Sequence, residues 1–245
     1  MKTTNLTSVA IAVLLGTVML AGAGCTNSKT NQETSDNMET LNLTQEWDKK
    51  FPQSDKVNHR KVTFKNRYGI TLAADLYEPK NVEGKLAAIA VSGPFGAVKE
   101  QTSGLYAQTM AERGFLTLAF DPSYTGESGG EPRNVASPDI NTEDFSAAVD
   151  FLTALSDVDA ERIGIIGICG FGGMGLNAAA MDTRIKATVA STMYDMSRVN
   201  ANGYFDAEDS ADDRNKKREM MNVIRTRDAQ SGTITPGVPG LPDSI

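Results

Sequence analysis

The chain has 245 residues, of which 40% are hydrophobic, 22% are charged and 7% are aromatic. These values are typical of a globular protein and exclude collagen, a coiled coil and disorder throughout the chain. The formal net charge of −7 argues against nucleic acid or an anionic membrane surface as the main partner. Two cysteines are too few for a disulfide scaffold, and the single histidine limits any mechanism that needs a histidine base.

The N-terminus predicts a targeting segment. Lys2 precedes an apolar run over residues 9–20, which is too short for a confident spanning helix but fits the core of a signal peptide. Cys25 follows a few small residues, and this order resembles a bacterial lipoprotein signal, in which the cysteine becomes the lipidated first residue. Ala21-Gly22-Ala23 also fits an ordinary cleavage site. We expect residues 1–24 to be removed and the protein to be exported, with a lipid on Cys25 as its membrane anchor.

Residues 25–60 are polar and predict a tether, with a short helix around residues 43–51. His59, near the end of this stretch, is expected to be a solvated loop residue. From Lys61 onward, apolar and polar side chains alternate on both sides of a turn at residues 66–69. This pattern predicts a β-hairpin with one buried face.

The body of the chain then alternates buried strands with helices. Strands are predicted at residues 86–91, 115–120, 162–169 and 185–190, and helices at residues 101–113, from Thr142 onward, and at residues 172–181. Strands separated by helices pair in parallel, because only adjacent antiparallel strands can be joined by a tight turn. The predicted fold class is therefore α/β, a doubly wound and mostly parallel sheet whose six strands lie within residues 61–196.

Residues 197–245 predict no packed element. Residues 205–230 are densely charged and form at most a solvated helix, with Met220, Met221 and Val223 on one side. The last fifteen residues are rich in glycine and proline. We therefore expect this part of the chain to be poorly ordered.

One motif carries chemistry. Residues 167–173 join a buried strand to a helix of small residues, which would place Cys169 on a tight turn at the carboxyl end of the sheet. The N–H of Gly170 would be one donor to a developing oxyanion, and Phe95 or Gly96 the second, because the residue before them is a proline without an N–H. The alternative is a buried structural cysteine, since cysteine is among the most buried residue types. The sequence shows no metal-ligand cluster or phosphate loop, so no cofactor is implied.

These features resemble the α/β-hydrolase superfamily, in its bacterial dienelactone-hydrolase-like branch, where the residue at this turn can be Cys instead of Ser. The resemblance rests on the turn at Cys169, the loop over residues 92–96 and the loop over residues 121–130. It implies an eight-stranded sheet, with Cys169 as the nucleophile, a catalytic acid after the seventh strand and a histidine after the eighth.

The same resemblance implies that the triad is incomplete here. The chain reaches about six of the eight strands, and no histidine follows Cys169. Asp195, just past the sixth predicted strand, is an alternative position for the acid. Residues 197–245 correspond to the start of a cap region, so we expect a truncated or frameshifted product with little activity.

Two functions from different classes are open at this point. The first is an exported hydrolase that cleaves an ester, thioester or lactone of a small acyl substrate through Cys169. The second is a non-catalytic surface lipoprotein that uses the hydrolase scaffold as a binding module. The sequence leaves the substrate and the oligomeric state open.

Overall fold

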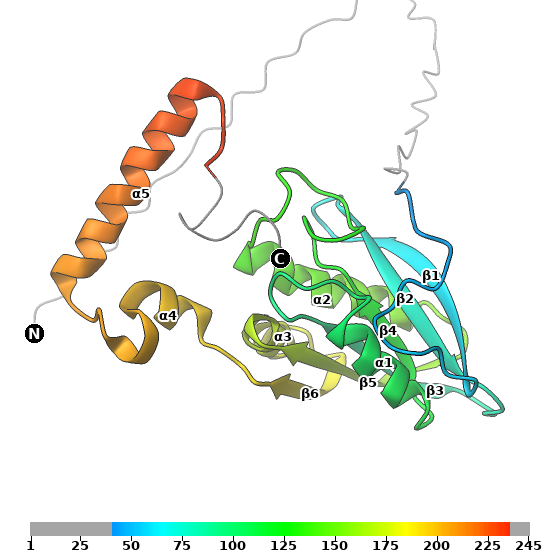
Figure 1. Cartoon of the computed structure of the whole chain (residues 1–245). Helices are drawn as coiled ribbons and strands as arrows, with labels where there is room; N and C mark the ends of the chain where they lie inside the picture. Colours follow the sequence, from blue (N-terminus) through cyan, green and yellow to red (C-terminus); the bar gives the residue numbers. More distant parts are fainter. Residues whose placement is uncertain (1–40, 236–245) are drawn as a thin grey trace, which may run out of the picture. The chain divides into compact units, whose positions relative to one another are not determined.

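The computed structural model describes residues 41–235. Its six strands are β1 (Val57–Lys65), β2 (Thr71–Pro79), β3 (Leu86–Ser92), β4 (Leu116–Phe120), β5 (Val158–Ile168) and β6 (Ile185–Ser191). They form one mixed sheet in the order β1-β2-β4-β3-β5-β6 (Figure 1). β3 pairs in parallel with β4 and β5, and β5 pairs in parallel with β6, whereas β2 is antiparallel to both β1 and β4.

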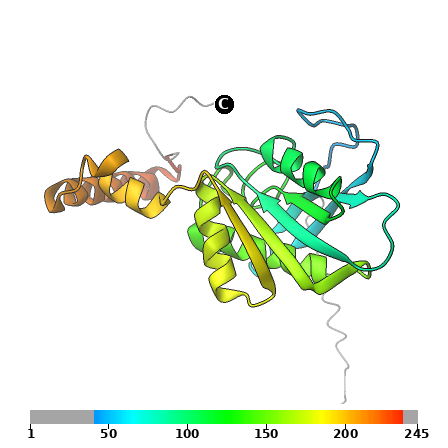
Figure 2. The ribbon, with the colours of Figure 1, turned by 90° about the horizontal axis from the view of Figure 1, so that it is seen from below.

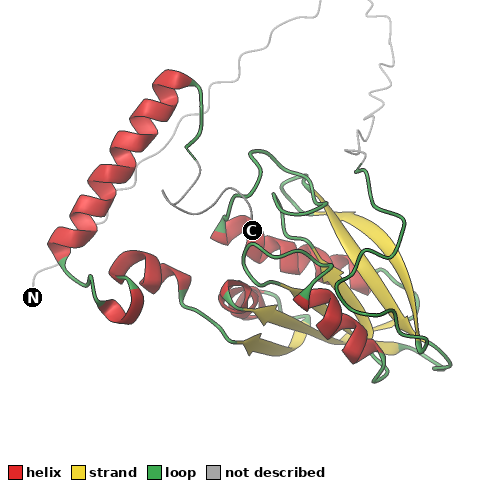
Figure 3. Ribbon diagram, viewed as in Figure 1, coloured by secondary structure: helices red, strands yellow, loops and turns green. Residues whose placement is uncertain are grey.

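Helices cover both faces of this sheet (Figure 3). They are α1 (Thr102–Ala111), α2 (Pro138–Thr153) and α3 (Gly170–Met181). Ala107 and Ala111 of α1 belong to one apolar cluster, while Phe145 of α2 and Met174 of α3 belong to the other. Figure 2 shows α3 lying beside β5 and β6. The predicted α/β class with helices on two faces is confirmed.

The opening hairpin forms as predicted, but its second strand is buried on both faces and not on one. Residues 71–77 of β2 are all buried. The reason is that both faces are covered: Leu76 packs in the apolar cluster of α2 and α3, and Tyr77 packs in that of α1. β4 pairs along the other edge of β2. The polar positions that suggested a solvated face include Asp75, which is fully buried and paired with Lys49 at 2.9 Å.

The helix expected to open at Thr142 begins four residues earlier. Ser137 is its N-cap, and the Ser137 hydroxyl accepts a hydrogen bond from the N–H of Ile140 at 3.5 Å. Pro138 follows as the first helical residue, and its lack of an N–H costs nothing there because an N–H at this position has no acceptor within the helix. Thr142 is therefore an interior position, and it is buried against the core.

The short helix expected around residues 43–51 does not form. Backbone groups of this segment bond to the body of the protein instead: the N–H of Lys50 donates to the carbonyl of Glu100 at 2.9 Å, and the carbonyl of Pro52 accepts from Gln108 at 3.0 Å. The first strand then starts at Val57, earlier than the hydrophobic alternation indicated. The segment over residues 41–56 is thus bound to the domain along its length.

After β6 the chain continues as α4 (Met196–Asn202), the short 3-10 helix η1 (Tyr204–Asp206) and α5 (Ala211–Ser231). None of the residues of α5 is buried, which agrees with the solvated helix that the charge pattern predicts. Within residues 41–235, none of the helices combines the length and the apolar character that crossing a bilayer requires. The predicted signal segment, Cys25 and the last ten residues lie outside the described residues.

Candidate active site

Cys169 lies in the turn between β5 and α3. Its backbone has φ 57° and ψ −125°, a conformation that L-residues rarely adopt. Two hydrogen bonds fix this backbone: the N–H of Cys169 donates to the carbonyl of Ser191 at 2.9 Å, and the carbonyl of Cys169 accepts from the N–H of Gly172 at 3.0 Å. The side chain is a half-buried free thiol. A residue with a strained backbone, placed between the end of a strand and the start of a helix, is a frequent feature of functional sites.

Small residues make this turn possible. A Cβ on Gly167 would lie only 2.3 Å from the carbonyl oxygen of Phe171, so the strand and the helix approach more closely than any side chain permits. Phe171 itself is buried, with its ring 6.4 Å from that of Phe145 and 6.2 Å from that of Phe95. The large side chain two residues after Cys169 therefore fills the core and leaves the thiol accessible.

The loop after β3 lies against this turn. A Cβ on Gly93 would be 2.4 Å from the carbonyl oxygen of Ile168, and a Cβ on Gly170 would be 3.4 Å from the Cβ of Phe95. The N–H groups of Phe95, Gly96 and Gly170 have no protein acceptor within the part of the chain that the structure describes. Three donors without such an acceptor thus lie on the turn at Cys169 and on the loop that packs against it, and donors of this kind can bind a developing negative charge on oxygen.

Asp195 acts as the N-cap of α4. Its Oδ1 accepts from the hydroxyl of Ser197 at 2.6 Å and from the N–H of Arg198 at 2.9 Å. These bonds, first the one from Ser197, hold the pKa of Asp195 below its ordinary value. The hydrogen bonds of this carboxylate are therefore local to its own helix, and the role of Asp195 as an acid toward Cys169 stays a prediction.

His59 is not the solvated loop residue that the sequence suggested. It lies in β1, and its Nε2 is 2.8 Å from Oδ1 of Asp75, which also binds Lys49. The rings of Trp47 and Tyr77 pack on it with centroid distances of 5.1 and 5.0 Å. Three strands separate β1 from β5 in the sheet order, so the single histidine of the sequence belongs to a different part of the domain from Cys169.

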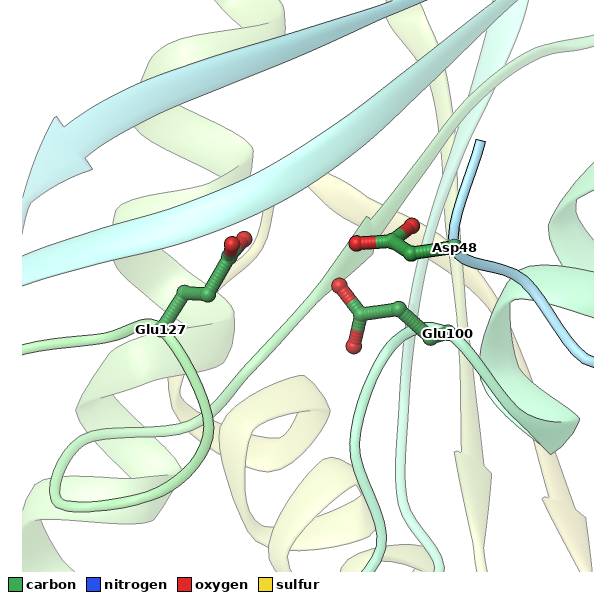
Figure 4. A group of neighbouring side chains, drawn as sticks. All are labelled: Asp48, Glu100 and Glu127. Atoms are coloured by element: carbon green, nitrogen blue, oxygen red, sulfur yellow. The ribbon is translucent and has the colours of Figure 1, made fainter. Parts of the chain in front are cut away.

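The sequence analysis did not predict a set of charged residues near the carboxyl ends of β3 and β4. This charged cluster consists of Asp48, Lys61, Lys99, Glu100, Asp121 and Glu127. Its members come from four separate segments, so no local pattern reveals it. Two signals were present in the sequence: Lys99 follows a loop of mostly small residues, and Asp121 comes directly after a buried strand. Figure 4 shows the carboxylates of Asp48, Glu100 and Glu127 converging, with one oxygen of each within 4.8 Å of the others.

These three carboxylates are the described residues best placed to hold a metal ion, but lysine ammonium groups already pair with them, among them Lys49, which lies 2.6 Å from Asp48. The Nζ of Lys61 lies 3.0 Å from Asp48, 2.7 Å from Glu127 and 3.6 Å from Glu100. The Nζ of Lys99 lies 2.7 Å from Glu127 and also pairs with Glu100. The group is therefore a set of internal ion pairs.

Burial and ion pairing compete in this cluster. Burial acts to raise the pKa of Glu127, but hydrogen bonds from Lys61 and Lys99 outweigh it and lower the pKa to about 2. Burial likewise acts to lower the pKa of Lys99, and the nearby Asp121 and Glu100 outweigh it, so this pKa is raised. For Asp121, which is completely buried, burial dominates over the Lys99 ammonium and raises the pKa to about 6.

Known proteins share both the sheet and the helices around it. The α/β hydrolase GrgF from a Penicillium species superposes with a TM-score of 0.60 at 23% identity, covering 76% of this chain and 60% of its own length. The architecture is therefore an α/β-hydrolase fold. Within this class the chain belongs to the X-Pro dipeptidyl-peptidase (S15) family, whose profile matches residues 68–233. The finer resemblance to dienelactone hydrolases stays a prediction.

Two relatives extend this comparison. The uncharacterized protein PA2218 of Pseudomonas aeruginosa is 65% identical over 226 residues, and the match covers 91% of this chain and 60% of that protein. Its crystal structure superposes with a TM-score of 0.77 over 79% of this chain and 60% of that one. The thiohydrolase aneE of Aspergillus aculeatus is 31% identical over 137 residues, which cover 56% of this chain and 42% of the relative. The chain thus spans about half of the length of such relatives.

Proposed function

We propose that this chain carries the nucleophile and the oxyanion donors of a thiol-dependent acyl hydrolase. Cys169 is the nucleophile, and the N–H groups of Gly170 and of Phe95 or Gly96 bind the oxyanion. The observation that supports this most directly is the position of the thiol on a strained turn, beside donors that have no other acceptor in residues 41–235. The fold and the family of the chain agree with a hydrolase.

The first half-reaction is an acyl transfer. The thiol of Cys169 gives its proton to solvent water, and the sulfur forms a bond with the carbonyl carbon while the carbonyl oxygen takes up the negative charge. Collapse of this intermediate breaks the bond to the leaving group, which departs as an alkoxide or thiolate and takes a proton from water. Water then cleaves the thioester formed on Cys169, releasing the acid and restoring the thiol.

The preferred substrate class follows from the leaving group. An amide needs a general acid to protonate its departing nitrogen, and histidine most often supplies this proton. Thioesters, lactones and activated esters of small acids release better leaving groups, so we propose these as substrates. One relative carries the name thiohydrolase, which agrees with this class.

The N-terminal segment completes the proposal. We propose that residues 1–24 direct export and that Cys25 receives a lipid, which would place the hydrolase at a membrane surface. Labelled palmitate tests this in a bacterial host: incorporation into the wild-type chain and none into Cys25→Ala supports the anchor. Secretion of an unlabelled wild-type chain contradicts it.

Mass spectrometry tests the proposed nucleophile. The purified chain is incubated with p-nitrophenyl acetate or with an acetyl thioester, and the modified peptide is mapped. We expect an acetyl group on Cys169 and none at this position in Cys169→Ala. Iodoacetamide serves as the control, because alkylation of a thiol needs no oxyanion donors. Alkylation of Cys169 without any acetylation would refute the hydrolase and favour the alternative of a binding module.

A further inference from the structure

The loop that carries Phe95 and Gly96, the two candidates for the second oxyanion donor, ends at a fully buried lysine. The side chain of Lys99 has no exposed surface, and its Nζ lies 2.9 Å from Asp121 and 2.7 Å from Glu127. The backbone N–H of Lys99 donates to Asp121 Oδ1 at 2.7 Å. Asp121 therefore holds Lys99 at two points, through its backbone and through its ammonium group.

Asp121 is itself fixed to the sheet. It directly follows β4, and its N–H donates to the carbonyl of Ala73 in β2 at 3.0 Å. Its Oδ2 accepts from the N–H of Glu127 at 2.9 Å, so the loop after β4 folds around this carboxylate. A Cβ on Gly126 would be 2.3 Å from Asp121 Oδ2, which shows how closely that loop is wrapped. The acceptor of Lys99 is thus part of the rigid sheet edge.

The two donors lie between two anchors. Gly93 packs against the carbonyl of Ile168 on one side, and Lys99 is bound to Asp121 on the other. A buried charge that loses its partners is expensive, so Lys99 has one favourable position. Phe95 and Gly96 stand within a few residues of each anchor, and their N–H directions depend on both.

We propose that Lys99 is a positioning residue that holds the N–H groups of Phe95 and Gly96 at the place where the oxyanion forms. This inference rests on the proposed attack by Cys169. Lys99 touches neither the thiol nor a substrate. It acts through the loop, and its charge is the means of attachment.

Lys61 provides a matched control. Its ammonium group is nearly as buried and pairs with three carboxylates of the same charged cluster. It projects from β1, however, and not from the loop after β3. Removing either lysine takes one ammonium group away from the shared Glu100 and Glu127, but only the loss of Lys99 frees the loop that carries the donors.

The test compares two reactions of the same thiol. Acetylation of Cys169 by p-nitrophenyl acetate passes through an oxyanion, whereas alkylation by iodoacetamide does not. The ratio of the two rate constants therefore reports the donors and cancels changes in thiol access or reactivity. We expect Lys99→Met to lower this ratio by about 10- to 100-fold, which approaches the loss of one oxyanion donor. Lys61→Met should leave it within about twofold.

A second variant covers the case in which Lys99→Met does not fold. Asp121→Asn keeps the shape of the side chain and removes the charge that holds Lys99, and we expect it to lower the ratio by about tenfold. An unchanged ratio in a folded variant at Lys99 or Asp121, or an equal fall in Lys61→Met, overturns the positioning role. A wild-type chain that is alkylated but never acetylated instead refutes the proposed function itself, and the positioning role with it.

Discussion

The turn at Cys169 and the charged cluster around Lys99 both follow the carboxyl ends of parallel strands, but different interactions hold them in place. The turn contains mainly small and apolar residues, and its geometry depends on a strand and a helix that approach within the space of a missing Cβ. The charged cluster packs two ammonium groups among four carboxylates, and Lys99 and Asp121 at its centre have no exposed side-chain surface. The turn has no room for an added side chain, whereas the charged cluster is stabilised by pairs of opposite charges.

This difference predicts different sensitivities. A region held by close backbone contact responds to an added methyl group and not to pH. A region held by buried ion pairs responds to the protonation of its members and to the loss of either sign of charge. Substitutions that separate these two responses test the comparison directly.

The largest effect is expected from a methyl group at the turn. In Gly167→Ala the new Cβ would lie 2.3 Å from the carbonyl oxygen of Phe171 and 2.9 Å from the Cα of Gly172, both of them backbone atoms that cannot move separately. We expect the free energy of unfolding to fall by about 1–3 kcal/mol, as measured by denaturant titration.

Gly173→Ala is the control for this substitution. Gly173 lies in the same helix, and a Cβ added there would be 3.6 Å from the nearest atom, the carbonyl oxygen of Tyr194, which is ordinary contact. Alanine is favoured over glycine in a helix, so this variant should be neutral or more stable by about 0.5–1 kcal/mol. Equal losses in the two variants would show that the turn does not depend on close backbone contact.

The charged cluster should give the chain a characteristic acid response. Hydrogen bonds from lysines outweigh burial and lower the pKa of Glu127 to about 2, and the same balance lowers that of Asp48 to about 2. As the pH falls below about 4.5, the unfolded chain takes up protons that the folded chain does not, so the folded state loses stability until about pH 2. Because these carboxylates are partly exposed, we expect about 1 kcal/mol from Glu127.

Asp121 contributes with the opposite sign in a higher range of pH. Burial raises its pKa to about 6, so the folded state binds a proton before the unfolded state does, and this ionisation opposes folding as the pH rises through 6. The two ranges meet at about pH 4, where thermal melts should therefore show a maximum. Glu127→Gln should flatten the acid side, while Gly167→Ala should lower the whole curve without changing its shape. A change of shape in the glycine variant would contradict the separation of the two regions.

The parts of the fold that local sequence determines were predictable. Continuous apolar runs identified the inner strands, and the short sequence around Cys169 carries the whole turn, because strand, glycines and helix follow one another in the chain. The helix start at Ser137 is also encoded locally, since a capping serine precedes a proline, although the glycines before it predict a loop that continues to Thr142.

The parts that depend on distant segments were not predictable in this way. β2 is buried on both faces because its side chains pack against helices that follow much later in the chain. The charged cluster brings Asp48, Lys61, Lys99 and Glu127 together from separate segments. Asp75 and His59 look solvated in sequence because each polar side chain finds its partner only after folding.

The smallest effect is expected at position 169, where glycine should give a more stable protein than alanine, the reverse of the usual order. At φ 57° and ψ −125°, a Cβ at position 169 is strained, and glycine relieves this strain. We therefore expect Cys169→Gly to be more stable than Cys169→Ala by about 1 kcal/mol in denaturant unfolding. Ala178→Gly, inside α3, should show the normal order and lose about 1 kcal/mol. Greater stability of Cys169→Ala would mean that the turn relaxes when the thiol is removed, and the strain at the proposed nucleophile would then not be imposed by the packing around it.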